Sequence, residues 1–457
     1  MIDYEILKVL WWVFIGVLLV GFAVMDGQDM GVGTLLPFLS KEDSERRIMI
    51  NSVAPHWDGN QVWLLTGGGA MFAAWPLMYA TAFSGFYWAM LIVLFVLIFR
   101  PVAFDYRSKV PSTKWRTNWD WLLFLGSAVP PIIFGVAFGN LLQGVPFEID
   151  ATMRPVYTGS FFGLLNPFGL LCGVLSLAMI VAHGANYLVL RTEGTLQEKA
   201  RKVGSVAAFL AFVLFLLGGV WVYLGIDGYV AVSGLDPAGP ANPLAKTVEI
   251  REGAWFANYG ACPVLWALPA LGLLGTLASA VLVRKGAAGK AIVASGVAML
   301  GIILTPLGAM FPFVMPSSVM PNAGLTLWDC TSSQLTLEVM FFVTLILLPL
   351  VRYGFPAIVE NGFAIMCTFG YIVWVDVVIL ICGLLGALTL RVPLKEYSRI
   401  CSKTVGHVLP VLITMGSLLV VAYIMQSSTT GMMNLLASDI AAVVGRFYPA
   451  AAVLIGA

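Results

Sequence analysis

Long runs of apolar residues, separated by short polar segments, fill the chain from its N-terminus onward. Many runs are about 20 residues long, which is the length that an α-helix needs to cross a bilayer. They do not alternate apolar and polar positions, so they do not indicate a membrane β-barrel. We expect nine spanning helices, at residues 6–27, 56–76, 79–100, 119–141, 161–190, 205–226, 260–283, 291–311 and 334–352. The fifth is long enough to require tilt or an interfacial extension.

Composition indicates the same class of protein. Of the 457 residues, 60% are hydrophobic and only 11% are charged, whereas about a quarter of the residues in a soluble domain are charged. We therefore expect an all-α integral membrane protein. The net charge of +1 gives no electrostatic basis for nucleic-acid binding. The N-terminus lacks the basic region and cleavage site of a signal peptide, so the first helix is expected to remain in the protein.

Lysine and arginine residues are distributed unequally between the predicted loops. Loops after odd-numbered spans carry fifteen of them, and loops after even-numbered spans carry only Arg154, Lys246 and Arg251. Because basic residues are retained on the cytoplasmic side of a membrane, the odd loops are expected in the cytoplasm. The N-terminus is then outside, and the natural location is a bacterial inner membrane.

The C-terminal part of the chain does not follow this alternation. Apolar stretches occur at about 364–390, 407–425 and 434–457, and simple alternation would place the basic cluster that follows the first of them outside. We therefore divide the chain into a membrane core of nine spans, residues 1–355, and a C-terminal extension, residues 356–457. The extension has one to three further apolar segments and no assigned role.

Ionisable residues gather where the predicted spans meet the cytoplasm. Four different spans contribute them: Asp26 and Asp29, His56 and Asp58, Arg100 and Asp105, and Asp120. A carboxylate inside an apolar segment costs about 2.5–3.5 kcal/mol on insertion scales unless it faces a polar interior. From the residues alone, two interpretations remain open. The carboxylates are either interfacial charges that pair with nearby cations or parts of a path that carries protons into the protein.

Ligands for a redox cofactor are scarce in this chain. Haem iron takes His, Met or Cys ligands, and the three histidines, His56, His183 and His407, show no spacing typical of a bis-histidine haem. The six cysteines have no CxxC spacing, which argues against zinc or an iron–sulfur cluster. We therefore expect no cofactor-binding and no metal-binding residue here. Trp57 and Trp63 are interpreted as interface or packing residues.

Several long and uncommon motifs occur in order over residues 1–350. They are Gly21–Gly33, Arg46–Trp63, Phe99–Pro101 with Asp105–Ser108, Gly139–Phe147, Gly225–Tyr229 and Phe311–Ser318. In these motifs the chain resembles subunit II of cytochrome bd-type quinol oxidases. The resemblance implies nine helices, arranged as two four-helix bundles plus one, beside a similarly folded subunit I.

The resemblance also implies a function. The complex would oxidise quinol, reduce dioxygen to water and generate a proton motive force. Subunit I would hold the haems (b and d, or b only) and the quinol site, so this chain would not be catalytic alone. Membrane lipid, a structural quinone and small accessory subunits are possible further partners.

The positions that match the family's polar inner-edge residues are Asp26, Asp29, Asp58, Arg100, Asp105 and Asp120. With His56, the five carboxylates are expected to form a cytoplasmic proton path. Arg100, Trp57 and Trp63 are expected to give structural or electrostatic support.

Two other functions remain open at this point. A proton-coupled transporter would also place carboxylates in membrane helices, but it would need a site near the midplane formed by broken helices. The acidic residues here lie at one edge. A purely structural subunit differs from the proton-path hypothesis only in whether the aspartates carry protons.

Overall fold

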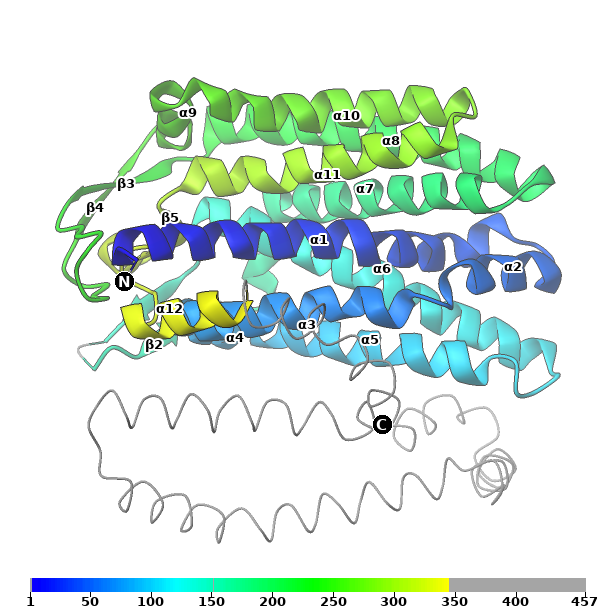
Figure 1. Ribbon diagram of the computed structural model, residues 1–457, viewed down its shortest axis with the longest axis horizontal. Coiled ribbons are helices and arrows are strands. Elements are labelled where there is room, and N and C mark those ends of the chain that lie inside the picture. The colour runs from blue at the N-terminus through cyan, green and yellow to red at the C-terminus, as the bar shows by residue number, and fades with distance from the viewer. Residues whose placement is uncertain (1, 151, 345–457) are drawn as a thin grey trace, which may run out of the picture. The chain divides into compact units, whose positions relative to one another are not determined.

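The computed structural model describes residues 2–150 and 152–344, which are mostly helical, with loops and three small sheets between the helices. In this part of the chain, seven helical segments are long and apolar enough to cross a membrane (Figure 1). They are α1 (Tyr4–Leu39), α5 (Tyr87–Tyr106), α6 (Thr113–Gln143), α7 (Pro167–Arg191), α8 (Gly194–Gly225), the segment Pro263–Arg284 and α11 (Ala288–Met310). The segment Pro263–Arg284 consists of the short helix η3 (Pro263–Trp266) followed by α10 (Ala267–Arg284). The expected class, an all-α integral membrane protein, is confirmed. The extension at 356–457 lies outside the described residues.

The second crossing is made by two consecutive helices, α3 (Trp57–Ala74) and α4 (Pro76–Gly85). The predicted end of the second span, at 76, and the predicted start of the third, at 79, are therefore both wrong. The helix does break at Trp75, because the following proline has no N–H to donate. The chain nevertheless continues onward through α4, and the return helix α5 starts only at Tyr87.

Other predicted boundaries also shift, and α1 continues to Leu39 although the first span was predicted to end at 27. The fifth span starts at Pro167 and not at 161, because the side chain of Asn166 caps the helix by accepting a hydrogen bond from the N–H of Gly169. The sixth, α8, begins at Gly194 and not at 205, so its first turns are polar. The ninth expected span begins with α12 (Gln334–Phe342), and its remainder lies outside the described residues.

Within the described residues, the helices from α1 to α11 that cross the fold form two groups. The first contains α1, α3 with α4, α5 and α6, and the second contains α7, α8, α10 and α11. The two groups meet where α1 and α6 pack on α7. A methyl group at Gly31 would overlap the carbonyl oxygen of Ile180, and one at Gly184 would overlap the backbone of Gly31. Glycine at these two positions therefore lets the backbones of α1 and α7 touch.

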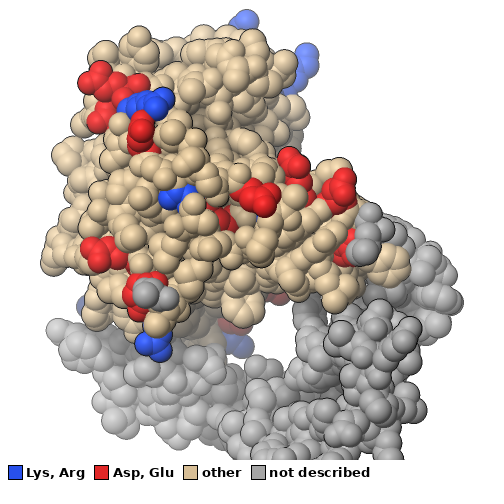
Figure 2. All heavy atoms as spheres, turned by 90° about the vertical axis from the view of Figure 1, so that its left-hand side faces the viewer, with Lys and Arg blue, Asp and Glu red and all other residues tan. Residues whose placement is uncertain are grey.

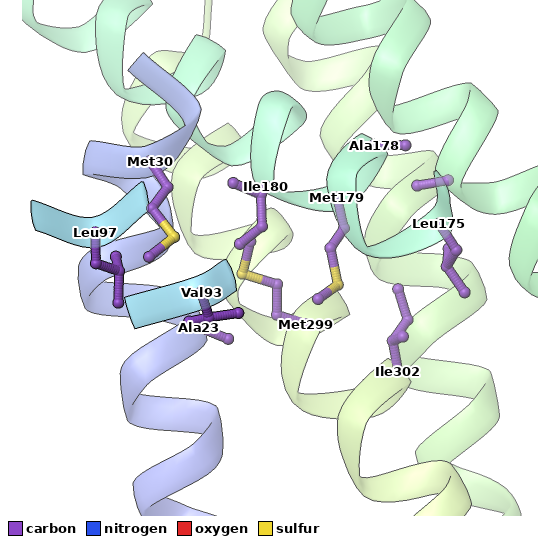
Figure 3. Close-up of a cluster of buried hydrophobic side chains, with 11 residues drawn as sticks. Ala23, Met30, Val93, Leu97, Leu175, Ala178, Met179, Ile180, Met299 and Ile302 are labelled. Carbon is purple, nitrogen blue, oxygen red and sulfur yellow. The ribbon is translucent and has the colours of Figure 1, made fainter. Parts of the chain in front are cut away.

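Buried apolar side chains fill this junction. Figure 3 shows Met30 of α1 and Val93 and Leu97 of α5 beside residues of α7 and α11. The cluster comprises Ala23, Met30, Val93, Leu97, Leu175, Ala178, Met179, Ile180, Ala211, Met299 and Ile302. It joins both helix groups into one core.

The two ends of the helix groups differ in structure and charge. All strands lie at the end where the chain begins, which we call the strand end (Figure 1). They are the antiparallel pairs β1 (Phe147–Ile149) with β2 (Pro155–Tyr157), β3 (Gly228–Ser233) with β4 (Thr247–Arg251), and β5 (Phe313–Met315) with β6 (Leu325–Thr326). The short helices η1 (Phe162–Leu164), η2 (Ala254–Phe256), α9 (Ala257–Ala261) and η4 (Pro321–Ala323) lie in the same connections.

Acidic side chains are spread over the strand end, and Lys and Arg are sparse there (Figure 2). At the opposite end, α1, α5 and α10 terminate and α2 (Asp43–Val53) connects α1 to α3. Most of the lysine and arginine residues counted above belong to this end, which we call the basic end.

Candidate functional site at the basic end

A buried ion pair joins α1 to α5. Arg100 donates from Nη1 to Oδ2 of Asp26 at 2.8 Å and from Nη2 to Oδ1 at 2.6 Å. Gly126 of α6 leaves room for this arginine, since a methyl group there would lie 3.0 Å from Cγ of Arg100. A bidentate arginine–carboxylate contact fixes both partners in one geometry. Asp26 is therefore held against a permanent cation.

Asp29, one turn further along α1, has a different environment. Its side chain is buried, and its Oδ2 accepts a hydrogen bond from Nδ2 of Asn60 in α3 at 2.8 Å. Its Oδ1 has no hydrogen-bond partner in the described part of the chain. Nδ1 of His56 lies 3.4 Å from that oxygen. A buried carboxylate oxygen without a partner is uncommon and indicates a functional or hydrated position.

The hydrogen bonds around His56 determine where its ring carries a proton. The hydroxyl of Tyr187 donates to the carbonyl of Ser52 at 2.7 Å, so it accepts from Nε2 of His56, which lies 2.8 Å away. In the neutral ring Nδ1 is then the acceptor, and Nδ2 of Asn60 lies 3.0 Å from it. A proton added to Nδ1 would therefore face the unpartnered oxygen of Asp29.

His56 also connects two environments. It precedes the first residue of α3, and 30% of its side chain is exposed, whereas the side chain of Asp29 is fully buried. The imidazole thus reaches from the edge of the protein to a carboxylate inside it. This arrangement is suited to passing a proton inward, because imidazole exchanges protons near neutral pH.

Asp120 belongs to a separate cluster. It is buried and accepts hydrogen bonds from Nε of Arg107 at 2.5 Å and from Nη1 of Arg46 at 2.9 Å. Arg107 also reaches Asp43 at 2.7 Å, and Arg116 pairs with the same carboxylate at 2.6 Å. These contacts tie α2 and α6 to the end of α5. Their geometry is that of a structural ion-pair network.

The carboxylates of α2 have lowered pKa values. Partial desolvation raises the pKa of Asp43, but the hydrogen bond and charge of Arg107 and the charge of Arg116 outweigh it, so the net shift is downward. The hydrogen bond from Lys199 lowers the pKa of Glu45, and the backbone N–H of Lys41 adds to the effect. Both carboxylates are therefore stabilised in the ionised form.

The predicted site residues thus fall into distinct groups. The structure brings Asp29 and His56 together, pairs Asp26 with Arg100, and places Asp120 in the ion-pair network. Asp58 and Asp105 are exposed and lie outside these groups.

The two tryptophans predicted to support the site make packing contacts. Trp57 stacks on Phe104 with ring centroids 4.9 Å apart, and Trp63 lies where a side chain on Gly21 would otherwise be.

Sequence reasoning missed two residues of the Asp29 site, Asn60 and Tyr187. Asn60 carried a usable signal, because it lies four residues after His56 and residues four apart share a helix face. Tyr187 carried none, since it comes from α7 and reaches His56 only through tertiary packing. Among the described residues, no three His, Cys, Asp or Glu side chains are grouped as metal ligands.

These features define a multi-pass helical membrane protein with a buried acidic site at its basic end. The chain belongs to the family of cytochrome bd terminal oxidase subunit II, whose sequence profile matches residues 7–357. The resemblance seen in the motifs is therefore confirmed, and the family favours an oxidase subunit over a transporter.

Individual relatives are similar over most of their length. The chain is 59% identical over 351 residues to cytochrome bd-I ubiquinol oxidase subunit 2 of Escherichia coli K12, covering 77% of this chain and 93% of that protein. It is 34% identical over 342 residues to cytochrome bd ubiquinol oxidase subunit 2 of Bacillus subtilis, covering 75% and 91%. A chain in the structure of bd oxidase from Geobacillus thermodenitrificans shares the fold, with a TM-score of 0.53 at 15% identity over 78% of this chain and 99% of that one.

Proposed function

We propose that this chain is the subunit of a quinol:oxygen oxidoreductase that binds no haem and that delivers protons from the cytoplasm. Its relatives are named as subunit 2 of ubiquinol oxidases, which supports a complex with a subunit I. That partner would carry the haems, b and d or b only, and the quinol site. The excess of basic residues at the basic end supports a cytoplasmic orientation of that end in the inner membrane.

One observation carries the proton-delivery proposal. Nδ1 of the partly exposed His56 lies 3.4 Å from the oxygen of buried Asp29 that has no hydrogen-bond partner among the described residues. His56 would take a proton at the edge and pass it to Asp29. Asp29 suits this role better than Asp26, because both oxygens of Asp26 accept hydrogen bonds from Arg100, whereas Oδ1 of Asp29 has no hydrogen-bond partner among the described residues.

The remaining predicted residues would serve this route in different ways. Asp58 and Asp105 are exposed at the basic end and would attract protons to its surface. Asp26 and Asp120, each held by arginine, would position the helices. Reducing dioxygen to water consumes protons. If these come from the cytoplasm while quinol releases its own outside, turnover generates a membrane potential without a pump.

The decisive variant is Asp29→Asn in the assembled complex. We expect oxygen consumption per haem to fall several-fold, because an amide cannot carry the proton, whereas Asp29→Glu should retain most of the rate. Glu42→Gln is the matched control, since Glu42 is an exposed carboxylate at the same end whose side chain, within the described residues, accepts a hydrogen bond from Ser44 and makes no ion pair. The haem spectrum of each variant reports assembly.

Wild-type turnover of Asp29→Asn with full haem content would reject proton delivery through this residue. It would leave the alternative of a purely structural subunit.

A further inference from the structure

A second feature of the basic end lies apart from the Asp29 site. It is a hollow of about 410 Å³ between α8 and the end of α10. Its lining consists of Glu198, Arg201, Lys202 and Val206 from α8 and Arg284 from α10. Two further exposed lysines follow in the sequence: Lys285 directly after α10 and Lys290 at the start of α11.

The charges of this hollow are not balanced by the protein. Three cations line it against one carboxylate, and none of the four makes an ion pair within the described residues. The cluster around Asp120 contrasts with this, because Arg46, Arg107 and Arg116 each meet a carboxylate there. Uncompensated cations around a concave surface attract an anion.

Arg201 is positioned for such an anion. Its Nη2 donates to Oε1 of Gln197 at 2.9 Å, and its guanidinium packs over Gly286, where a methyl group would lie 3.2 Å from Nη2. Its Nε is buried and has no acceptor in the described part of the chain. The guanidinium is thus held in place by contacts within the protein, while its charge meets no carboxylate among the described residues and is available to an anion in the hollow.

Below the hollow, the surfaces of both helices are apolar. Val206 and Phe209 of α8 are 62% and 54% exposed, and Val281 of α10 is 44% exposed. A ligand that fits both parts has an anionic head and hydrocarbon chains. Basic pockets between membrane helices recognise the head groups of anionic lipids.

We propose that this hollow binds one anionic phospholipid of the adjacent leaflet. Its phosphate lies against Arg201, Lys202 and Arg284, and its acyl chains lie along Val206 and Phe209. The carboxylate of Glu198 would repel a dianionic phosphate but would accept a hydrogen bond from a head-group hydroxyl. A monoanionic phosphodiester with a polyol head group, as in phosphatidylglycerol, therefore fits the site.

The test uses the complex of this chain with its partner, purified in mild detergent and titrated with phosphatidylglycerol. Bound lipid per complex is measured by native mass spectrometry. The variant is Lys202→Gln with Arg284→Gln, two exposed residues whose replacement leaves the core intact. The control is Lys109→Gln with Lys114→Gln, which removes the same charge from two exposed positions, one just before α6 and one in its first turn.

We expect the variant to bind phosphatidylglycerol on the order of 30-fold more weakly, because it removes two basic residues and each contributes about 1 kcal/mol near a membrane surface. The control should bind like the wild type, and phosphatidylcholine should bind weakly to all three. Equal affinity of wild type and variant, or an equal loss in the control, would overturn the proposal. Val206→Asp tests the contact with the acyl chains. If excess inorganic phosphate displaces phosphatidylglycerol and Val206→Asp binds this lipid as tightly as the wild type, the hollow binds a free anion and the lipid proposal is rejected.

Discussion

Arg100 and Asp26 make two parallel hydrogen bonds, at 2.8 and 2.6 Å, inside the first helix group, where the side chains are 1% and 0% exposed. Such a pair does not by itself prove a gain in stability, because both charges lose hydration when buried. Because both side chains are buried, removing either one leaves the charge of the other without a partner. A charge left alone there has no water to replace the lost ion pair.

We therefore expect Arg100→Gln to destabilise the complex by about 3–5 kcal/mol, the usual cost of leaving one buried charge unpaired. The double variant Asp26→Leu with Arg100→Met should be more stable than Arg100→Gln, because it removes both charges. Thermal unfolding of the purified complex measures this. Arg116→Gln is the control and should change stability little, since its partner Asp43 is 43% exposed. If the double variant is no more stable than Arg100→Gln, the unpaired charge of Asp26 is not the cause of the lost stability.

Asp58 tests whether protons are collected at the surface of the basic end. It lies in the first turn of α3, two residues after His56, and it is exposed. If it relays protons, Asp58→Asn should slow oxygen consumption per haem and Asp58→Glu should largely preserve it, because only the carboxylate ionises. A structural role predicts the opposite order, since Asn preserves the shape. Wild-type speed in Asp58→Asn at full haem content would remove Asp58 from the route.

The helices and the end of the protein that carries the site could be predicted from the sequence, because both depend on local composition. An apolar run long enough to span a bilayer forms a helix regardless of its neighbours. The turn at Phe86 could not be predicted, since the apolar run continues through it, whereas the break at Pro76 separates two helices of the same crossing.

The partner of each aspartate could not be predicted either. Asp26 and Asp29 are three residues apart on α1, yet one meets an arginine of α5 and the other meets α3. Which of two neighbouring carboxylates is neutralised by a cation depends on the rotation and packing of three helices. No pattern within α1 contains that information. The division between a fixed ion pair and an unpaired carboxylate therefore emerges only from the structure.

Glu45 should make stability depend on pH. Its pKa is below the ordinary 4.5 because it accepts hydrogen bonds from Lys199 and from the N–H of Lys41. A carboxyl whose pKa is lower in the folded than in the unfolded state stabilises the fold when ionised. That contribution is complete at pH values above 4.5 and is lost as the pH falls through the lowered folded pKa.

We expect Glu45→Gln to have a lower melting temperature than the wild type at neutral pH. On acidification below pH 4.5, its melting temperature should fall by less than that of the wild type. Lys199→Met should behave similarly, because it removes the main cause of the shift. Glu42→Gln, which lacks a lysine or arginine partner, serves as the control. The measurement is the melting temperature of the wild type and each variant, recorded from neutral to acidic pH. The prediction fails if Glu45→Gln and the wild type lose the same amount.

The last prediction concerns haem. Both nitrogens of His183 are occupied, since Nδ1 lies 2.7 Å from the hydroxyl of Ser295 and Nε2 donates to the carbonyl of Val24 at 3.1 Å. His56 is likewise engaged at both nitrogens, and His407 lies outside the described residues. An iron ligated by either described histidine would have to displace hydrogen bonds made inside the protein. We therefore expect the chain expressed without its partner to show no Soret band, and His183→Ala to lower its melting temperature without any spectral change. A stoichiometric Soret band in the isolated chain that disappears in His183→Ala would show that the chain binds haem itself.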